Sequence, residues 1–266
     1  MTAPTPTAEA PPASVRVSAV SGRVTVVAGS AFSVKGAADV RRDGAVATVA
    51  AGSSRVEVTV PAGARVAIGT TSGRVQARGR LGDTAVTSAS GRVSVDHAAS
   101  VDIRCGSGRV EVGSVDGMCR VRAENGRVSV ERAGTADVST ESGRIEVGSV
   151  TGPVRAHSVS GRITIGLSEA ADVDAETISG RIEVRVPRGI EAAIDRGDGE
   201  PAAETAQCHF RAASVNGGVV VVSAGRCGRL GDRVGARWRR PRRRLVHRWG
   251  GFHRVQGGLG RGGRGG

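Results

Sequence analysis

The sequence predicts an all-β fold, and more narrowly a single-stranded parallel β-helix (β-solenoid) with about 17–18 residues per rung. Three observations lead to this prediction. A short corner motif recurs at nearly constant spacing, the residues around it alternate between apolar and polar, and aromatic residues are scarce. No aromatic residue lies between Phe32 and Phe210, so the core of that stretch has to be aliphatic and narrow. The sequence leaves the hand of the coil open, and we favour the right-handed one.

The corner motif is Ser-Gly-Arg followed by Val or Ile. Its copies begin at Ser21, Ser72, Ser90, Ser107, Ser142, Ser160 and Ser179, and degenerate copies begin at Ser53, Asn125 and Asn216. From Ser72 to Ser179 the steps are 18, 17, 18, 17, 18 and 19 residues. Glycine at the corner supplies the positive φ that a sharp bend between strands needs. Two short strands per step cannot bury a face alone, so the steps must stack on one another.

The residues on both sides of the corner alternate with a period of two. After the corner at Ser107, for example, Val110 and Val112 are separated by a polar residue, which places both aliphatic side chains on one face of a strand. The positions six, four and two residues before a corner are apolar or small and form a second strand facing the same interior. Cys105 and Cys119 fall on these inward positions, so we expect them in the core. The four cysteines lack the spacing of a zinc site, and we expect neither metal nor cofactor.

One outward column provides a test of the stacking. Five positions before successive corners the residues are Asp102, Arg120, Asp137, Arg155 and Asp174, which alternate in sign. Neighbouring strands lie about 4.8 Å apart, so stacking places each of these charges between two opposite ones. Unstacked strands give no reason for such an alternation.

The arginines of the corner form a second outward column, of a single sign. This column is the candidate anion-binding site, and it consists of Arg74, Arg92, Arg109, Arg127, Arg144, Arg162 and Arg181. Two residues further along, another column carries a carboxylate on roughly every second rung, at Glu111, Glu146 and Glu183. These carboxylates offset about half of the repulsion within the arginine column.

The formal net charge of +13 is concentrated at the C-terminal end. Residues 226–266 contain 13 arginines and one aspartate, which leaves the preceding 225 residues near +1. Arginine with interspersed tryptophan and glycine can bind nucleic acid through phosphate contacts and stacking. The alternative is that a GC-rich reading frame is translated past its proper end, and the abrupt break in the repeat favours this second interpretation.

These observations divide the chain into three parts. Residues 1–13 are predicted to be a disordered leader, residues 14–223 the repeat domain, and residues 224–266 a disordered tail rich in arginine and glycine. Within the repeat domain, 14–68 form irregular first rungs, 69–186 the regular array, and 187–223 a loop and a last rung. The sequence shows neither a secretory signal nor a membrane-spanning segment, so as written we expect a cytoplasmic protein. A misassigned start codon would make the cell surface an alternative.

The run of Ser-Gly-Arg-Val corners, with the segment Val60-Pro-Ala-Gly-Ala-Arg-Val66 ahead of the regular array, resembles the bacterial adhesin-like β-strand-repeat family of unknown function. The resemblance covers about residues 14–223. Members of that family usually carry aspartate where this chain has arginine, so the charge of the corner is inverted here. The family has no established activity, and the resemblance therefore implies a repeat fold without any catalytic residues.

Three classes of function remain open at this point. The first is a non-catalytic structural or interaction module, adhesin-like, that associates with itself or with a protein partner, because solenoid ends favour association. The second is binding of a polyanion or nucleic acid through the arginine column or the arginine-rich tail. The third is a carbohydrate-active enzyme of the β-helix type. We do not expect an enzyme, because the array lacks aromatic platforms for sugars and no Ser-His-Asp group stands out.

Overall fold

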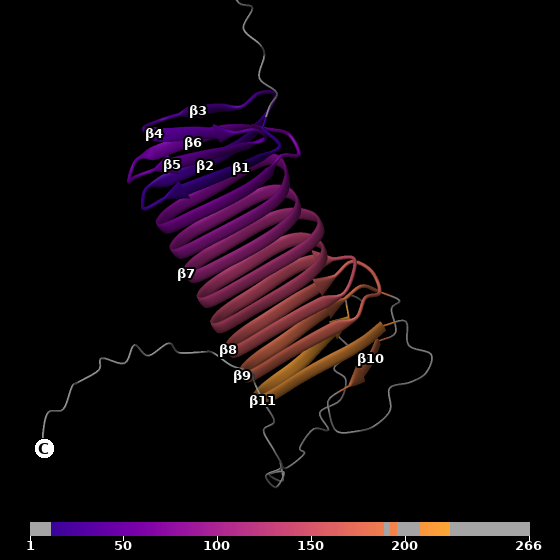
Figure 1. Ribbon diagram of the computed structural model, residues 1–266. Helices are drawn as coiled ribbons and strands as arrows, with labels where there is room; N and C mark the ends of the chain where they lie inside the picture. The colour runs from indigo at the N-terminus through magenta and orange to yellow at the C-terminus, as the bar shows by residue number, and fades with distance from the viewer. Residues whose placement is uncertain (1–11, 189–191, 196–207, 224–266) are drawn as a thin grey trace, which may run out of the picture. The chain divides into compact units, whose positions relative to one another are not determined.

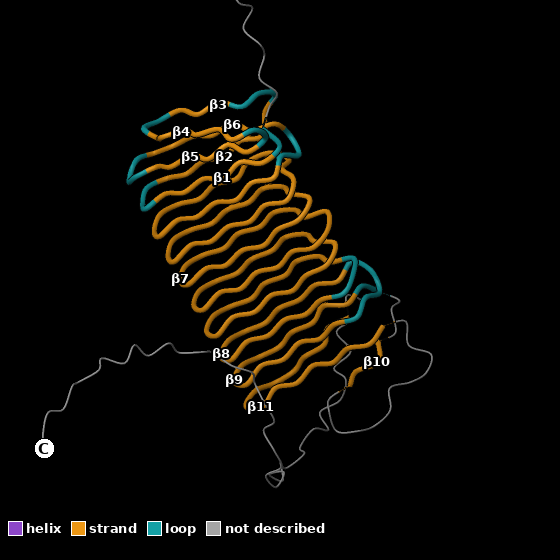
Figure 2. Tube along the Cα trace, viewed as in Figure 1, coloured by secondary structure: helices purple, strands orange, loops and turns teal. Residues whose placement is uncertain are grey.

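The computed structural model describes residues 12–188, 192–195 and 208–223, all within one compact unit, Met1–Cys227. The predicted all-β fold is confirmed, because every regular element in the described residues is a strand (Figures 1 and 2). The strands are β1 (Ser14–Ala19), β2 (Arg23–Gly29), β3 (Ser33–Lys35), β4 (Ala38–Asp43), β5 (Val46–Ala51), β6 (Arg55–Pro61), β7 (Arg65–Val150), β8 (Val154–Leu167), β9 (Val173–Val186), β10 (Ala192–Asp195) and β11 (Cys208–Ser223).

Most strands pair in parallel, and successive turns of the chain lie one above another in a solenoid-like stack (Figure 1). β7 alone passes through several turns, because its corners bend sharply without interrupting the strand (Figure 2). Equivalent residues of the repeat are in register: Arg144 of β7 pairs with Arg162 of β8, which pairs with Arg181 of β9. The corner arginines therefore form a true column on the surface.

The core is aliphatic and continuous along the stack, as the period-two pattern predicts. Ile145, Ile163 and Ile182 pair in successive turns and are fully buried. Cys105 and Cys119 are also buried as free thiols, which confirms the core position expected for them. The aliphatic side chains that face this interior supply most of the hydrophobic stabilisation, and Phe210 of β11 adds a fully buried aromatic side chain.

The corner glycines are required by both conformation and space. Gly73 has φ +135°, and a Cβ placed on it would lie 2.3 Å from the carbonyl oxygen of Gly22 in the neighbouring turn. Gly108 has φ +136°, and its Cβ would meet the carbonyl of Gly91 in the same way. Any side chain at these positions collides with backbone, so the turns can approach to strand-pairing distance only because the corner residue is glycine.

The order of the turns departs from a simple coil at the N-terminal end. Chain order would place β5 and β6 between the β1–β2 turn and β7, but β1 pairs with both β5 and β7, and β2 pairs with both β6 and β7. The β1–β2 turn is thus inserted between the β5–β6 turn and the first turn of β7. In this order Val15 and Val17 of β1 are buried between two neighbouring strands, and the charged strand β4 lies at the edge beyond β5.

The two ends of the stack are built differently (Figure 1). At one end β3 and β4 lie antiparallel to β6 and β5, and they form a short, charged covering. At the other end β11 pairs with β9 over Phe210–Ser223, while β10 covers only Cys208–Arg211. The part of the chain that the structure describes contains no helix long and apolar enough to span a membrane. The predicted leader up to residue 11, most of the loop after residue 187 and the predicted tail lie outside the described residues.

Candidate functional site

The column of corner arginines borders an open groove on the surface of the stack. The groove has a volume of about 940 Å³ and is lined only by glycine and arginine: Gly22, Gly73, Gly91, Gly108, Arg23, Arg55, Arg74, Arg92, Arg109 and Arg127. The glycines have no side chain to fill the hollow, and the arginines of the corner copies supply its charged wall. We call this feature the arginine groove.

Four of the seven arginines predicted as anion-binding residues line this groove: Arg74, Arg92, Arg109 and Arg127. The other three, Arg144, Arg162 and Arg181, continue the same column in register but do not line it. The predicted column omits Arg23 and Arg55, which the structure adds at its N-terminal end. Both are the arginines of corner copies, which begin at Ser21 and Ser53, so the motif itself was the signal that could have included them.

The spatial order of the groove arginines follows the inserted turn. Arg23 pairs with Arg55 on one side and with Arg74 on the other, so the row runs Arg55, Arg23, Arg74, Arg92, Arg109, Arg127. Five strand spacings separate its ends, which amounts to about 24 Å. The arginine groove is therefore an extended charged row and differs from the concave, mostly apolar pocket that small molecules prefer.

Neutralisation by the neighbouring carboxylates is uneven. Among the described residues, Arg109 alone of the groove arginines has an acidic partner, since its Nη1 lies 3.6 Å from Oε1 of Glu111. Arg144, beyond the groove, pairs with Glu146 at the same distance. Glu183 pairs with Arg185 at 2.8 Å instead of with Arg181. Among the described residues, the predicted offset by carboxylates is thus absent at Arg23, Arg55, Arg74, Arg92 and Arg127.

The alternating column five residues before the corners stacks as predicted. Asp137 pairs in register with Arg155, and Arg155 pairs with Asp174. Arg120 Nε donates a hydrogen bond to Asp137 Oδ2 at 3.3 Å. Arg211 of β11 lies opposite Asp174 and extends the alternation by one position. This column is charge-balanced, so it stabilises the stack locally and offers no site for an anion.

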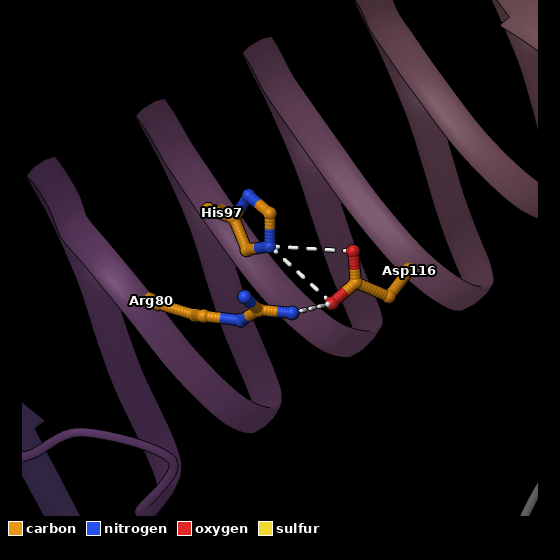
Figure 3. A network of polar contacts seen from close by, with 3 residues as sticks. All are labelled: Arg80, His97 and Asp116. Carbon is orange, nitrogen blue, oxygen red and sulfur yellow. Dashed lines mark hydrogen bonds and ion pairs between the residues drawn. The ribbon is translucent and has the colours of Figure 1, made fainter.

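A third polar feature joins three successive turns at the opposite corner of the repeat (Figure 3). Arg80 Nη2 donates a hydrogen bond to Asp116 Oδ2 at 2.9 Å, and His97 Nε2 lies 3.3 Å from both carboxylate oxygens of Asp116. The hydrogen bonds from His97 and Arg80 hold the pKa of Asp116 below its usual value of 3.8. No serine, threonine or cysteine hydroxyl or thiol in the described residues hydrogen-bonds to His97, so the group is a clip between turns and lacks a nucleophile.

The two thiols of the core, Cys105 and Cys119, are unreactive. Burial raises the pKa of Cys119 to about 12, and burial together with the charge of Glu124 raises the pKa of Cys105. A thiol that stays protonated is a poor nucleophile and a poor metal ligand. Within the described residues, no three His, Cys, Asp or Glu side chains come together as a metal site.

Comparison with known families agrees with this architecture. A model of the family Toastrack DUF4097 matches residues 12–219, which is most of the chain. The chain belongs to the Toastrack family. This Toastrack family is a domain family of unknown function, and the match says nothing of adhesion, so the adhesin-like resemblance is not established by it. A search of the curated proteins finds no match to the chain. A search of the solved structures finds none either.

Proposed function

We propose that this Toastrack domain is a non-catalytic interaction module that binds an extended polyanion along the arginine groove. The observation that carries the proposal is the lining of the groove, in which five of six arginines lack an acidic partner among the described residues. Like charges stacked about 4.8 Å apart repel one another. A polymer with several negative charges relieves this repulsion and accepts charge-assisted hydrogen bonds from the guanidinium groups.

The chemistry of the groove restricts the ligand. The groove contains neither aromatic nor apolar side chains, so it offers no surface on which bases or sugar rings could stack. Recognition then rests on repeated oxyanion groups, which phosphate polymers and sulfated polysaccharides share. Arginine suits both because its planar fork can bind two oxygens at once. Nucleic-acid binding by the arginine-rich tail is a separate prediction, and it falls on residues outside those described.

The same proposal includes the finer description of the fold and the wider class of function. We describe the repeat as a single-stranded, right-handed parallel β-helix with about 17–18 residues per rung, which suits a stiff support for a charged row. An adhesin-like structural role fits the same geometry, because surface polymers of cells are commonly anionic. Catalysis is not part of the proposal, since the clip at Asp116 lacks a nucleophile and the core thiols are held protonated.

The test compares two triple variants of the full-length chain that lose the same charge. The first replaces three groove arginines without an acidic partner, Arg74→Ser, Arg92→Ser and Arg127→Ser. The control replaces three exposed arginines elsewhere on the stack, Arg104→Ser, Arg122→Ser and Arg132→Ser. Both variants keep the arginine-rich tail, so its contribution cancels. Binding to inorganic polyphosphate and to heparin is measured by titration across a series of salt concentrations.

The groove variant is expected to bind at least about tenfold more weakly than the control, which corresponds to about 0.5 kcal/mol for each arginine lost. The salt dependence is plotted as the logarithm of the binding constant against the logarithm of the salt concentration. The slope of this plot should be smaller in magnitude by about 2 for the groove variant than for the control, because each lost contact contributes about 0.7. Stronger dependence on polyphosphate than on heparin identifies phosphate as the preferred group, and the reverse identifies sulfate. Equal weakening in both triple variants contradicts the proposal, because it attributes binding to net charge or to the tail.

A further inference from the structure

The last strand of the stack lacks the corner arginine that every earlier turn of the regular array carries, and it lacks the other two charges of the turn before it. In register with Arg181, Glu183 and Arg185 of β9, strand β11 has Gly218, Val220 and Val222. No charged residue occurs between Arg211 and the end of β11 at Ser223. This last turn is the only turn after Ser72 in which the corner arginine is replaced.

This edge is uncovered in the described residues. β10 covers only Cys208–Arg211, and no described strand pairs with the outer side of β11 from Ala212 onwards. The inward residues Val219 and Val221 are only partly buried, whereas their counterparts Ile182 and Val184 in the preceding turn are completely buried. The core consequently ends in an incompletely covered layer.

Exposed apolar side chains gather at the same end. Val159, Ile178 and Val215 stand directly before three successive corners, and Val220 and Val222 project outward from β11. These five residues make up most of the large apolar side chains that are exposed in the described part of the chain. A solvated edge normally carries charges or is very short, as β3 and β4 are at the other end. The contrast between the ends indicates that β11 is built to be covered.

We propose that β11 pairs with β11 of a second copy of this chain, antiparallel and about a two-fold axis, to form a dimer joined at the C-terminal ends of the two stacks. The argument for a second copy is electrostatic. At a two-fold axis each residue meets its own copy, so any charge there faces the same charge. A different partner could place an opposite charge against an arginine or a glutamate on the edge. Pairing with a second copy disfavours both residues, because each would face a like charge.

The register of such a pair follows from the side-chain alternation. Directly opposed residues of antiparallel strands point to the same face, so a two-fold axis at Val220 places Val220 opposite itself and Gly218 opposite Val222 of the partner. The carboxylate of Glu183 or the guanidinium groups of Arg181 and Arg185, had they been repeated in β11, would occupy these positions. Gly218, Val220 and Val222 therefore leave this contact without any charge. Pairing also closes the association, because the charged β3–β4 end offers no equivalent edge.

The test uses charge reversal at the axis in the full-length chain. Val220→Glu and Val220→Arg each place like charges opposite one another and should raise the dissociation constant of the dimer at least about tenfold. Mixed in equal amounts, the two variants should recover a heterodimer, since glutamate then faces arginine. Val40→Glu is the matched control, because Val40 is exposed to a similar degree (43% against 46% for Val220) but lies on β4 at the other end.

Association is measured by sedimentation equilibrium over a concentration series, with the 27.0 kDa chain as the monomer reference. Recovery of the dimer in the mixture also shows that both variants are folded, so loss in the separate variants cannot be due to unfolding. A wild-type chain that stays monomeric up to its solubility limit overturns the proposal. So does a mixture that fails to associate, or a Val40→Glu variant that dissociates as strongly as the Val220 variants.

Discussion

Replacing the corner glycine Gly73 with alanine tests whether the spacing of the turns depends on this residue. The new Cβ would lie 2.3 Å from the carbonyl oxygen of Gly22, which is 0.7 Å inside the 3.0 Å that real Cβ atoms keep from such neighbours. The same oxygen accepts a hydrogen bond from the backbone N–H of Arg74 at 2.9 Å. Relieving the collision lengthens that bond to about 3.6 Å, at which it is lost.

The expected cost combines two effects. Alanine in the left-handed region of φ costs about 1–2 kcal/mol, and the lost hydrogen bond costs about 1 kcal/mol. Further opening of the turns adds to these costs, and the lower entropy of the unfolded alanine chain offsets about 0.5 kcal/mol. We expect Gly73→Ala to lower the free energy of unfolding by about 2–3 kcal/mol. With a urea dependence of about 2–3 kcal/mol per molar, the midpoint of urea unfolding falls by about 1 M.

Gly69→Ala is the matched control, four residues earlier in the same strand. Gly69 has no positive φ, and a Cβ placed on it has no neighbour within 4 Å. Alanine there should stabilise the protein by about 0.5 kcal/mol, because it reduces the freedom of the unfolded chain. Urea unfolding followed by circular dichroism compares the two variants. Equal midpoints for Gly73→Ala and Gly69→Ala would refute the reasoning, since they differ only in φ and in available space.

Three further predictions concern the core and the clip. Ile163→Ala should lower the free energy of unfolding by about 2–5 kcal/mol, because Ile163 is fully buried, whereas Val159→Ala on the surface should change it by less than about 0.5 kcal/mol in the same urea assay. Because the pKa of Cys119 is raised, the stabilising effect of its neutral thiol is complete below its usual pKa of 9.0 and is lost as pH rises to about 12. Unfolding free energies should fall by about 1.4 kcal/mol per pH unit in that window, and Cys119→Ala should lack this part of the slope. The pKa of Asp116 is lowered, so its contribution is present above the usual value of 3.8 and is lost at more acidic pH. Asp116→Asn should therefore be less stable than the wild type near neutral pH and equally stable in strong acid, and a difference that does not change with pH contradicts this role.

Much of the repeat could be predicted from the sequence because its information is local. The alternation around each corner predicts which side chains face inward, and Cys105 and Cys119 are buried as that pattern requires. The alternating charges of Asp137, Arg155 and Asp174 predict the register, since only stacked turns bring them together. Repeats translate so directly into structure because each turn contacts only its neighbours.

Other features depended on contacts between distant parts of the chain. The β1–β2 turn lies between β5–β6 and β7 because strands compete for buried positions, and nothing in the local pattern ranks them. The order of Arg55, Arg23 and Arg74 along the arginine groove follows from this insertion. The pairing of Glu183 with Arg185 could not be predicted from the sequence either. Arg181 and Arg185 are both two residues from Glu183, so the sequence does not show which of them its flexible side chain contacts.

The sequence alone therefore determined the all-β repeat, the inward and outward faces and the glycine at each corner, since these follow from periodicity and from the sterics of a single residue. The tertiary structure alone decided where the arginines lack acidic partners and which edge of the stack is left open. Both depend on which turns become neighbours at the two ends of the stack, and there the repeat no longer dictates the pairing.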